Sequence, residues 1–535
     1  MIILAGFLEV LFKALVLIGL ASAVGGVVFC LAVLRPLSRN DHYSPQCLNR
    51  SLILIACGSG LLALAQALML LIEPWALADE MGRWPLTQFM ATQFARASML
   101  HAVLGLCLLA ASVWLLKRPA SRPRWAAMTA TMVLLLGSGA WLVHAVSQLN
   151  HVVPLMVATV IHQFDAFVWA GGVLHLMVLR VFLAGSPTGK NLWPVVVARF
   201  SLLAVLSIGI LIMSALYLSF YYVGDWGGLI GTAYGAMVLT KAALLAFALC
   251  LGALNFFSVR RWTHLGDASD LSERAPVLIE GEVFIAMIIL SAAAALTSQP
   301  PAVDQLADRA SPVEVLQVFS PKLPQLVPPP PQEIFAHATS SFDFLTSPAP
   351  HDRIQSNFKH NVSGLLVVII GTCAMLDRVG KVHFARHWPL LFVLLALFIP
   401  LFTEPTGFGN EGFWETLIIP EVLQHRLATL LVAGLALFEW SVRTGRFTQT
   451  RWSLVFPLLC LAGSALMLTH THNVFAVKSA FLIEISHNAI GILAVCVGVG
   501  RWLEIRLPKP TNRLPGFLWI ACVILVGLVL FSYKE

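Results

Sequence analysis

Long apolar segments recur along the whole chain of 535 residues, and they constrain its fold more than any motif does. A helix that crosses the hydrocarbon of a membrane needs about 20 mostly apolar residues, because lipid cannot hydrogen-bond to backbone N–H and C=O groups. With this length as the criterion, the sequence predicts spans at 4–34, 51–72, 93–116, 125–147, 155–180, 194–221, 229–258, 277–299, 361–377, 388–403, 418–440, 452–470, 477–501 and 514–532. We therefore expect an all-α protein, a polytopic transmembrane helix bundle of about 14 spans in contact with membrane lipid.

Composition agrees with a membrane protein, since 58% of the residues are hydrophobic and only 11% are charged. The first span is expected to stay in the mature protein, because no positive segment precedes its apolar core as in a signal peptide. The nine cysteines contain no CxxC pair and fall mostly inside spans. We interpret them as packing residues and expect neither a thiolate metal site nor a disulfide framework.

The distribution of Lys and Arg predicts the orientation of the spans. Alternate connections are basic, as at Lys117–Arg124 and Arg501–Arg513, whereas the intervening connections are acidic or neutral, as at Glu404–Glu415. Basic connections stay in the cytoplasm, so we expect both termini to be periplasmic. The net charge of +7 is then a topology signal and gives no reason to expect nucleic-acid binding.

One long Pro-rich and polar segment, residues 300–359, interrupts the series of spans and contains the stretch LPQLVPPPPQEIF. Such composition is typical of linkers. We therefore predict an N-terminal eight-helix membrane domain at 1–299, an extracytoplasmic linker or cap at 300–359, and a C-terminal six-helix membrane domain at 360–535.

Histidines inside the spans are the strongest functional candidates, because polar side chains in a membrane are costly and usually face the bundle interior. At about 1.5 Å per residue, the candidates of both halves lie roughly 21 to 30 Å from the cytoplasmic ends of their spans, in the outer part of a membrane about 30 Å thick. These candidates are His101, His144 and His162 in the first half and His360, His425, His470 and His487 in the second. His151 and His472 are expected beside them at the outer mouth.

Neutral imidazoles in this number suit copper or b-type haem, and proton relay is a third use. The predicted metal ligands are His144, His151, His162, His425, His470, His472 and His487, with His101, His360 and the thioether of Met467 as additional candidates. Helical rise makes His425 a better partner for His487 than His472. The nearby carboxylates of Asp165, Glu421 and Glu484 could orient the imidazoles, although they could equally be ordinary helix-surface neighbours.

Four phrases in the first half resemble the CopD/PcoD copper-resistance D family of bacterial inner-membrane proteins, over residues 155–303. They are HQFDAFVWAGGVLHLMVLRVF at 162–182, ARFSLLAVLSIGILIMSAL at 198–216, TAYGAMVLTKAALLAFALCLGALN at 232–255 and EVFIAMIILSAAAALTSQPPA at 282–302. The second half is similar to the extension of longer members, as in EVLQHRLATLLVAGLALFEW at 421–440 and SHNAIGILAVCVGVGRWLEIR at 486–506. In the first phrase, Gly171 and Gly172 are expected to allow close helix packing.

The resemblance implies copper transport or handling across the bacterial inner membrane and copper resistance, without enzymatic activity. It also implies a small periplasmic copper-binding protein of the CopC type as a partner, which we expect to be a separate chain. Two other functions remain open from the residues. One is electron transfer by haem b with two axial histidines, either His425 with His487 or two of His101, His144 and His162. The other is a membrane anchor for a periplasmic copper chaperone.

Overall fold

The computed structural model describes residues 2–37, 45–142, 151–183, 187–328, 330, 350–380, 382–402, 414–469 and 477–534. These residues form helices and connections, and no strand occurs among them. Within the same ranges, 14 helices are long and apolar enough to cross a membrane. The predicted all-α polytopic bundle is thereby confirmed.

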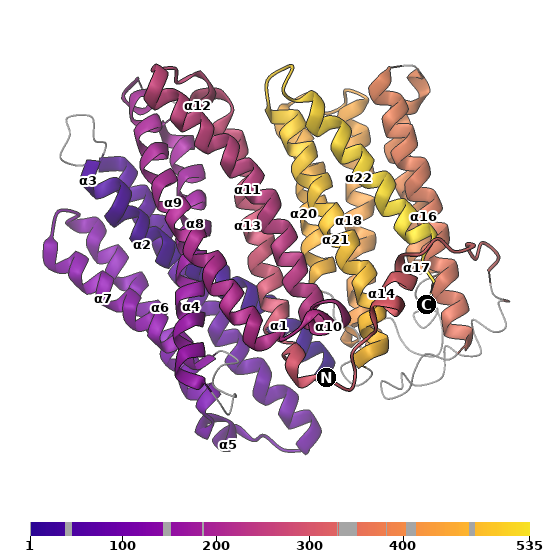
Figure 1. Cartoon of the computed structure of the whole chain (residues 1–535), viewed down its shortest axis with the longest axis horizontal. Helices are drawn as coiled ribbons and strands as arrows, with labels where there is room; N and C mark the ends of the chain where they lie inside the picture. The colour runs from indigo at the N-terminus through magenta and orange to yellow at the C-terminus, as the bar shows by residue number, and fades with distance from the viewer. Residues whose placement is uncertain are drawn as a thin grey trace. The chain divides into compact units, whose positions relative to one another are not determined.

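Two compact units make up the chain, and the first comprises residues 1–224 and 244–298. Its long helices are α1 (Ile2–Leu20), α4 (Pro45–Met81), α6 (Gln93–Lys117), α7 (Arg122–Gly139), α8 (Val152–Leu183), α9 (Pro187–Tyr222), most of α11 (Ala233–Leu265) and α13 (Ala275–Leu296). Short helices α5 (Leu86–Ala91) and α12 (Ser269–Glu273) lie between them. Helix α8 is central to this unit because it packs against α4, α9 and α13 (Figure 1).

The first span is not a regular α-helix throughout. After α1 it continues through the π-helical turn η1 (Ala21–Gly25), α2 (Gly26–Phe29), a second π-helical turn η2 (Cys30–Leu34) and α3 (Arg35–Leu37). Turn η1 lies against α8 so closely that a Cβ atom on Gly171 would overlap the carbonyl oxygen of Ala21. A Cβ on Gly172 would overlap the ring of Phe200 in α9. The expected packing role of these two glycines is confirmed.

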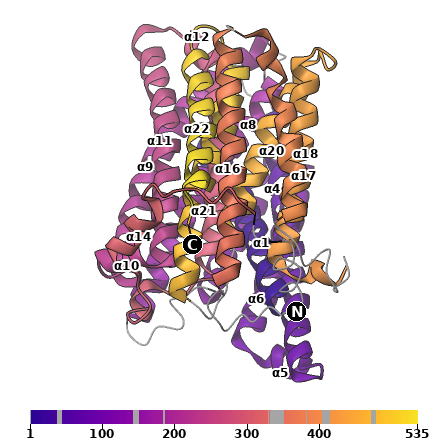
Figure 2. The same ribbon diagram turned by 90° about the vertical axis from the view of Figure 1, so that its right-hand side faces the viewer.

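The second unit comprises residues 225–243 and 299–535. Its spans are α16 (Pro350–Val379), η6 (His383–Leu390) continued by α17 (Leu391–Phe402), α18 (Pro420–Arg443), α19 (Thr450–Ser453) followed by α20 (Val455–Leu468), α21 (Val477–Arg506) and α22 (Arg513–Phe531). Shorter elements are α10 (Trp226–Gly231), η5 (Ala302–Asp304), α14 (Pro312–Phe319) and η8 (Glu415–Ile418). Helix α22 packs against both α16 and α21 (Figure 2).

The segment predicted as a linker, 300–359, contains more structure than its composition indicated. Helix α14 begins with a capping box, in which Ser311 and Glu314 satisfy each other's backbone N–H groups. Glu314 also pairs with Lys478 at the start of α21, at 2.7 Å. Helix α16 begins at Pro350, inside the predicted linker, and residues 331–349 lie outside the described part. The division into an eight-span and a six-span domain stays a prediction.

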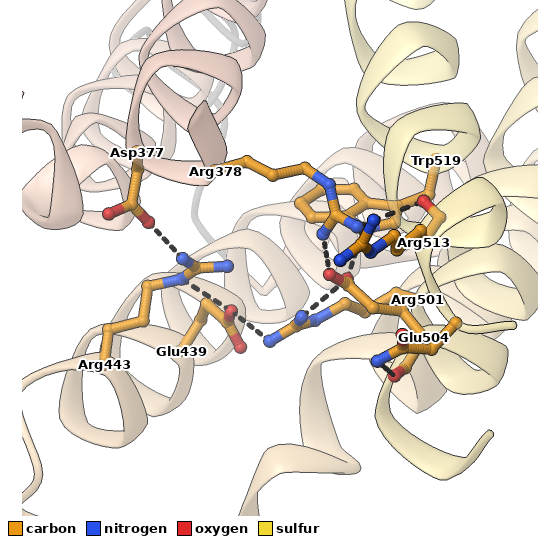
Figure 3. A network of polar contacts seen from close by, with 9 residues as sticks. Asp377, Arg378, Glu439, Arg443, Arg501, Glu504, Arg513 and Trp519 are labelled. Atoms are coloured by element: carbon orange, nitrogen blue, oxygen red, sulfur yellow. Dashed lines mark hydrogen bonds and ion pairs between the residues drawn. The ribbon is translucent and has the colours of Figure 1, made fainter. Parts of the chain in front are cut away.

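A chain of ion pairs joins the helix ends of the second unit that carry the basic connections (Figure 3). Arg443 of α18 forms ion pairs with Asp377 and, at 2.8 Å, with Glu439. Arg501 of α21 pairs with the same Glu439 at 3.0 Å and with Glu504 at 2.7 Å. Glu504 also accepts from Arg378 and from the indole N–H of Trp519. We call these residues, Asp377, Arg378, Glu439, Arg443, Arg501, Glu504 and Trp519, the ionic network. The Glu439 side chain is fully buried, so its charge depends on these partners.

Candidate functional site

His360 of α16 and His487 of α21 lie side by side in the second unit. Their ring centroids are 5.7 Å apart and their planes make an angle of 86°. Tyr533, just after α22, packs its ring 4.1 Å from that of His360 and 6.4 Å from that of His487. Counting along α16 from Asp377 and along α21 from Glu504, each histidine lies about 25 Å from the ionic network at 1.5 Å per residue. The pair therefore occupies the opposite end of the unit, which the sequence predicts to face outward.

His425 of α18 belongs to the same group of side chains. It is half-buried, and it lies close enough to Lys359 and His487 for their charges to interact. His360 is likewise within electrostatic reach of His425. We refer to His360, His425 and His487 as the histidine cluster. Lys359 places a positive charge beside the cluster.

Hydrogen bonds at Nδ1 set the tautomer of two cluster histidines. His360 Nδ1 is 2.8 Å from the carbonyl oxygen of Ser356, and His487 Nδ1 is 2.9 Å from that of Ile483, each four residues earlier in the same helix. A carbonyl oxygen can only accept, so each Nδ1 donates its hydrogen. A neutral imidazole then carries its lone pair on Nε2, the atom through which it can bind a metal.

The first unit repeats this arrangement with serine hydroxyls. His101 Nδ1 is 2.9 Å from Ser138 Oγ, and that hydroxyl donates to the carbonyl of Leu135. His162 Nδ1 is 3.2 Å from Ser214 Oγ, which donates to the carbonyl of Leu211. Each hydroxyl has used its hydrogen, so it accepts from Nδ1 and leaves the imidazole lone pair on Nε2. Four histidines that the sequence predicts near the outer face thus share one tautomer.

His175 of α8 is different. It is completely buried, and its Nε2 donates to the carbonyl oxygen of Ser22 in η1, at 3.0 Å. Its ring fills the space that a side chain on Gly26 would occupy. His175 therefore ties the π-helical turn to α8, and we interpret it as a structural residue.

The remaining predicted ligands are His144, His151, His470, His472 and Met467. His144, His470 and His472 lie outside the described residues. His151 is exposed just before α8, has a positive φ of 57° and packs 5.4 Å from the Tyr221 ring. Met467 is half-buried in the last turn of α20.

The carboxylates proposed to orient the histidines are placed as follows. Asp165 and Glu484 are buried, and Asp165 hydrogen-bonds to the Ser207 side chain. The side chain of Glu421 lies outside the described part. The Nδ1 atoms of His101, His162, His360 and His487 instead bond to serine hydroxyls or backbone carbonyls. The sequence did not predict these partners.

No three His, Cys, Asp or Glu side chains come together in a metal-binding arrangement within the ranges that the structure describes. The described residues do contain a pair of neighbouring imidazoles, His360 and His487, with His425 near them. Such a pair can hold a metal of low coordination number, and a third ligand requires a side-chain movement.

Comparison with known proteins agrees with the predicted family. Residues 194–296, from within α9 to the end of α13, match the family of copper resistance protein D. A stretch of 140 residues is 31% identical to the copper transport protein CutJ of Bacillus subtilis (strain 168), covering 26% of this chain and 24% of that protein. The chain thus matches about a quarter of that relative's length. No solved structure matches. Residues 194–296 are thus similar to the copper resistance protein D family, and they belong to a chain whose many long apolar helices are those of a multi-pass membrane protein.

Proposed function

We propose that this protein transports or handles copper in the bacterial inner membrane, and that the histidine cluster binds the metal at the outward end of the second unit. The observation that carries the proposal is the neighbouring pair of imidazoles from α16 and α21, each with its Nε2 lone pair fixed by an Nδ1 hydrogen bond. The match to the copper resistance protein D family and the name of the relative, copper transport protein CutJ, support copper as the cargo. In this proposal the metal is cargo, and the protein is not an enzyme.

Copper chemistry suits these residues. Imidazole is a good copper ligand, and two imidazoles can satisfy Cu(I), which accepts low coordination numbers. His425 would complete a third position. His151, His470 and His472 would collect the metal at the outer mouth, where a periplasmic protein of the CopC type could deliver it. In the first unit, His101 and His162 present the same ligand atom as the cluster does.

Haem b is less well supported. An iron held by two histidines needs one imidazole on each face of the macrocycle. The Tyr533 ring already packs 4.1 Å from His360 and 6.4 Å from His487, so protein side chains fill the space beside the pair. This arrangement favours an ion over a flat macrocycle.

Competition between the purified protein and a chromogenic Cu(I) chelator tests the proposal. We expect His360→Ala and His487→Ala each to weaken Cu(I) binding at least about tenfold, since a ligand is lost. His383→Ala is the matched control, because His383 is exposed and lies in η6, near the ionic network. Equal affinities in all four proteins would refute the site. A Soret band in the purified protein would favour haem instead.

Uptake of copper into liposomes separates transport from anchoring. Transport predicts uptake by the wild-type protein and a loss of uptake in the His360→Ala and His487→Ala variants. An anchor for a chaperone would bind copper or its carrier without any uptake.

A further inference from the structure

Among the residues that the structure describes, one amide group donates a hydrogen bond to a buried carboxyl of the first unit. Glu282 lies in the first half of α13 and is 6% exposed. Its Oε1 atom accepts a hydrogen bond from the Nδ2 atom of Asn255 in α11, at 2.5 Å. Both residues lie inside predicted spans, where an ionisable side chain is a functional candidate by default.

No cation neutralises this carboxyl among the described residues. Helix α13 packs against α1, α8 and α12, and Asn255 connects it to α11. The titratable groups on these elements are Glu9 and Lys13 in α1, His162, Asp165, His175 and Arg180 in α8, Asp270 and Glu273 in α12, and Lys241, Arg260, Arg261 and His264 in α11, with Glu280 on α13 itself. Lys13 lies beside Glu9, His175 bonds to Ser22, and Arg180 bonds to the Ser272 carbonyl.

An isolated carboxylate in such a place would cost several kcal/mol of lost hydration, which one amide N–H does not offset. A carboxyl avoids this cost by holding a proton. A hard metal cation is a poor alternative, since it needs about six or more oxygen ligands and the pair supplies only the oxygens of one carboxyl and one amide.

Gly252 and the amide oxygen of Asn255 lie beside the carboxyl. Gly252 is one turn before Asn255 in α11, and a Cβ atom there would be in ordinary van der Waals contact with Glu282 Oε2, at 3.4 Å. The Oδ1 atom of Asn255 is buried and has no hydrogen-bond partner among the described residues. It is therefore an acceptor that could take a hydrogen bond from a water molecule.

We propose that Glu282 and Asn255 form a proton-binding site of the first unit, in which the carboxyl is neutral at pH 7 and exchanges its proton with water. Release of the proton converts Glu282 to a carboxylate, and the Nδ2–H group of Asn255 stabilises that anion until a proton returns. This site does not depend on copper being the cargo. If Cu(I) is moved, release of one proton from this site in the opposite direction would balance the charge of one ion.

Infrared spectroscopy of the protein in lipid nanodiscs tests the site directly. We expect a carbonyl stretching band of a protonated carboxylic acid at pH 7 that is lost in Glu282→Gln and shifts in deuterium oxide. Glu280→Gln is the matched control, because it removes a carboxyl two residues away on the same helix, and its spectrum should keep the band. Asn255→Leu should keep the acid but move the band, since the amide hydrogen bond is gone.

Two results would overturn the proposal. If the infrared difference spectrum between the wild-type protein and Glu282→Gln contains no band of a protonated acid, the carboxyl is ionised. A band that does not respond to deuterium oxide would show a sealed structural acid. Elution of every variant as a single species in size-exclusion chromatography would establish that these spectra report folded protein.

Discussion

The imidazole of His360 packs edge to face against the imidazole of His487, with ring centroids 5.7 Å apart and an interplanar angle of 86°. The two residues come from α16 and α21, 127 positions apart in sequence. Their Nδ1 atoms are both engaged by the backbone, so the Nε2 atoms are the ones that can act on a ligand.

Lys359 should weaken metal binding at the histidine cluster. Its charge lies near His425 and repels any cation bound there. We expect Lys359→Met to raise Cu(I) affinity several-fold, up to about tenfold, which is a gain of about 1.4 kcal/mol. Lys509→Met removes the same charge from an exposed position beyond α21 and should leave the affinity unchanged. A lower affinity in Lys359→Met would show that the lysine supports the site.

Gly171 should be intolerant of any side chain. A Cβ atom there would meet the backbone of Ala21, which cannot move as a flexible side chain would. We expect Gly171→Ala to destabilise the first unit by about 1–3 kcal/mol, seen as a lower thermal midpoint in detergent. Gly209→Ala is the control, because open space surrounds that helical glycine and alanine favours helix. Equal midpoints for the two variants would contradict the close contact between η1 and α8.

Arg501 should be essential to the ionic network. It pairs with both Glu439 and Glu504, and Glu439 is fully buried. Arg501→Met removes one ion-pair partner from each of these carboxylates. Breaking a buried ion pair in this way lowers the free energy of unfolding by about 3–5 kcal/mol. The thermal midpoint of the protein should fall accordingly, whereas the exposed Arg451→Met should change it little. A midpoint close to that of the wild-type protein would indicate that water replaces the arginine.

Acid should loosen α14. The ammonium of Lys478 and two hydrogen bonds from Ser311 lower the pKa of Glu314 to about 2. The attachment of α14 is then complete above the ordinary carboxyl pKa of about 4.3 and is lost as the pH falls toward 2. Pepsin cleavage within residues 312–319 should therefore accelerate as the pH falls from about 5 to about 2, relative to Glu314→Gln. A constant ratio between the two proteins would show that the ion pair does not hold the helix.

The sequence predicts the spans well because each must be apolar over a membrane thickness, and that requirement is local. It missed the first turns of α16, which begin at Pro350 in polar sequence, and the π-helical turns of the first span, for which the residues 21–34 give no local signal. The position of a residue along its span could also be calculated from the helical rise. This calculation predicts that His360, His425 and His487 lie at the same end of their spans.

Lateral neighbours could not be predicted in the same way, because they depend on how helices pack. His425 is the partner that the sequence predicts for His487, and the two lie within electrostatic reach of each other, but the sequence does not indicate that the ring of His360, an additional candidate, also packs against His487. Ser138 and Ser214 escaped notice because they lie 37 and 52 residues from the histidines they accept from. A serine inside a predicted span is a signal of the same kind as a carboxylate, because a polar side chain there needs a polar partner.

The most direct test of copper binding at the cluster is the X-ray absorption spectrum of the protein loaded with one equivalent of Cu(I). We expect scattering from imidazole nitrogens in the wild-type protein and its loss in the double variant His360→Ala, His487→Ala. A spectrum that shows sulfur ligands alone, or one that the double variant leaves unchanged, would contradict it.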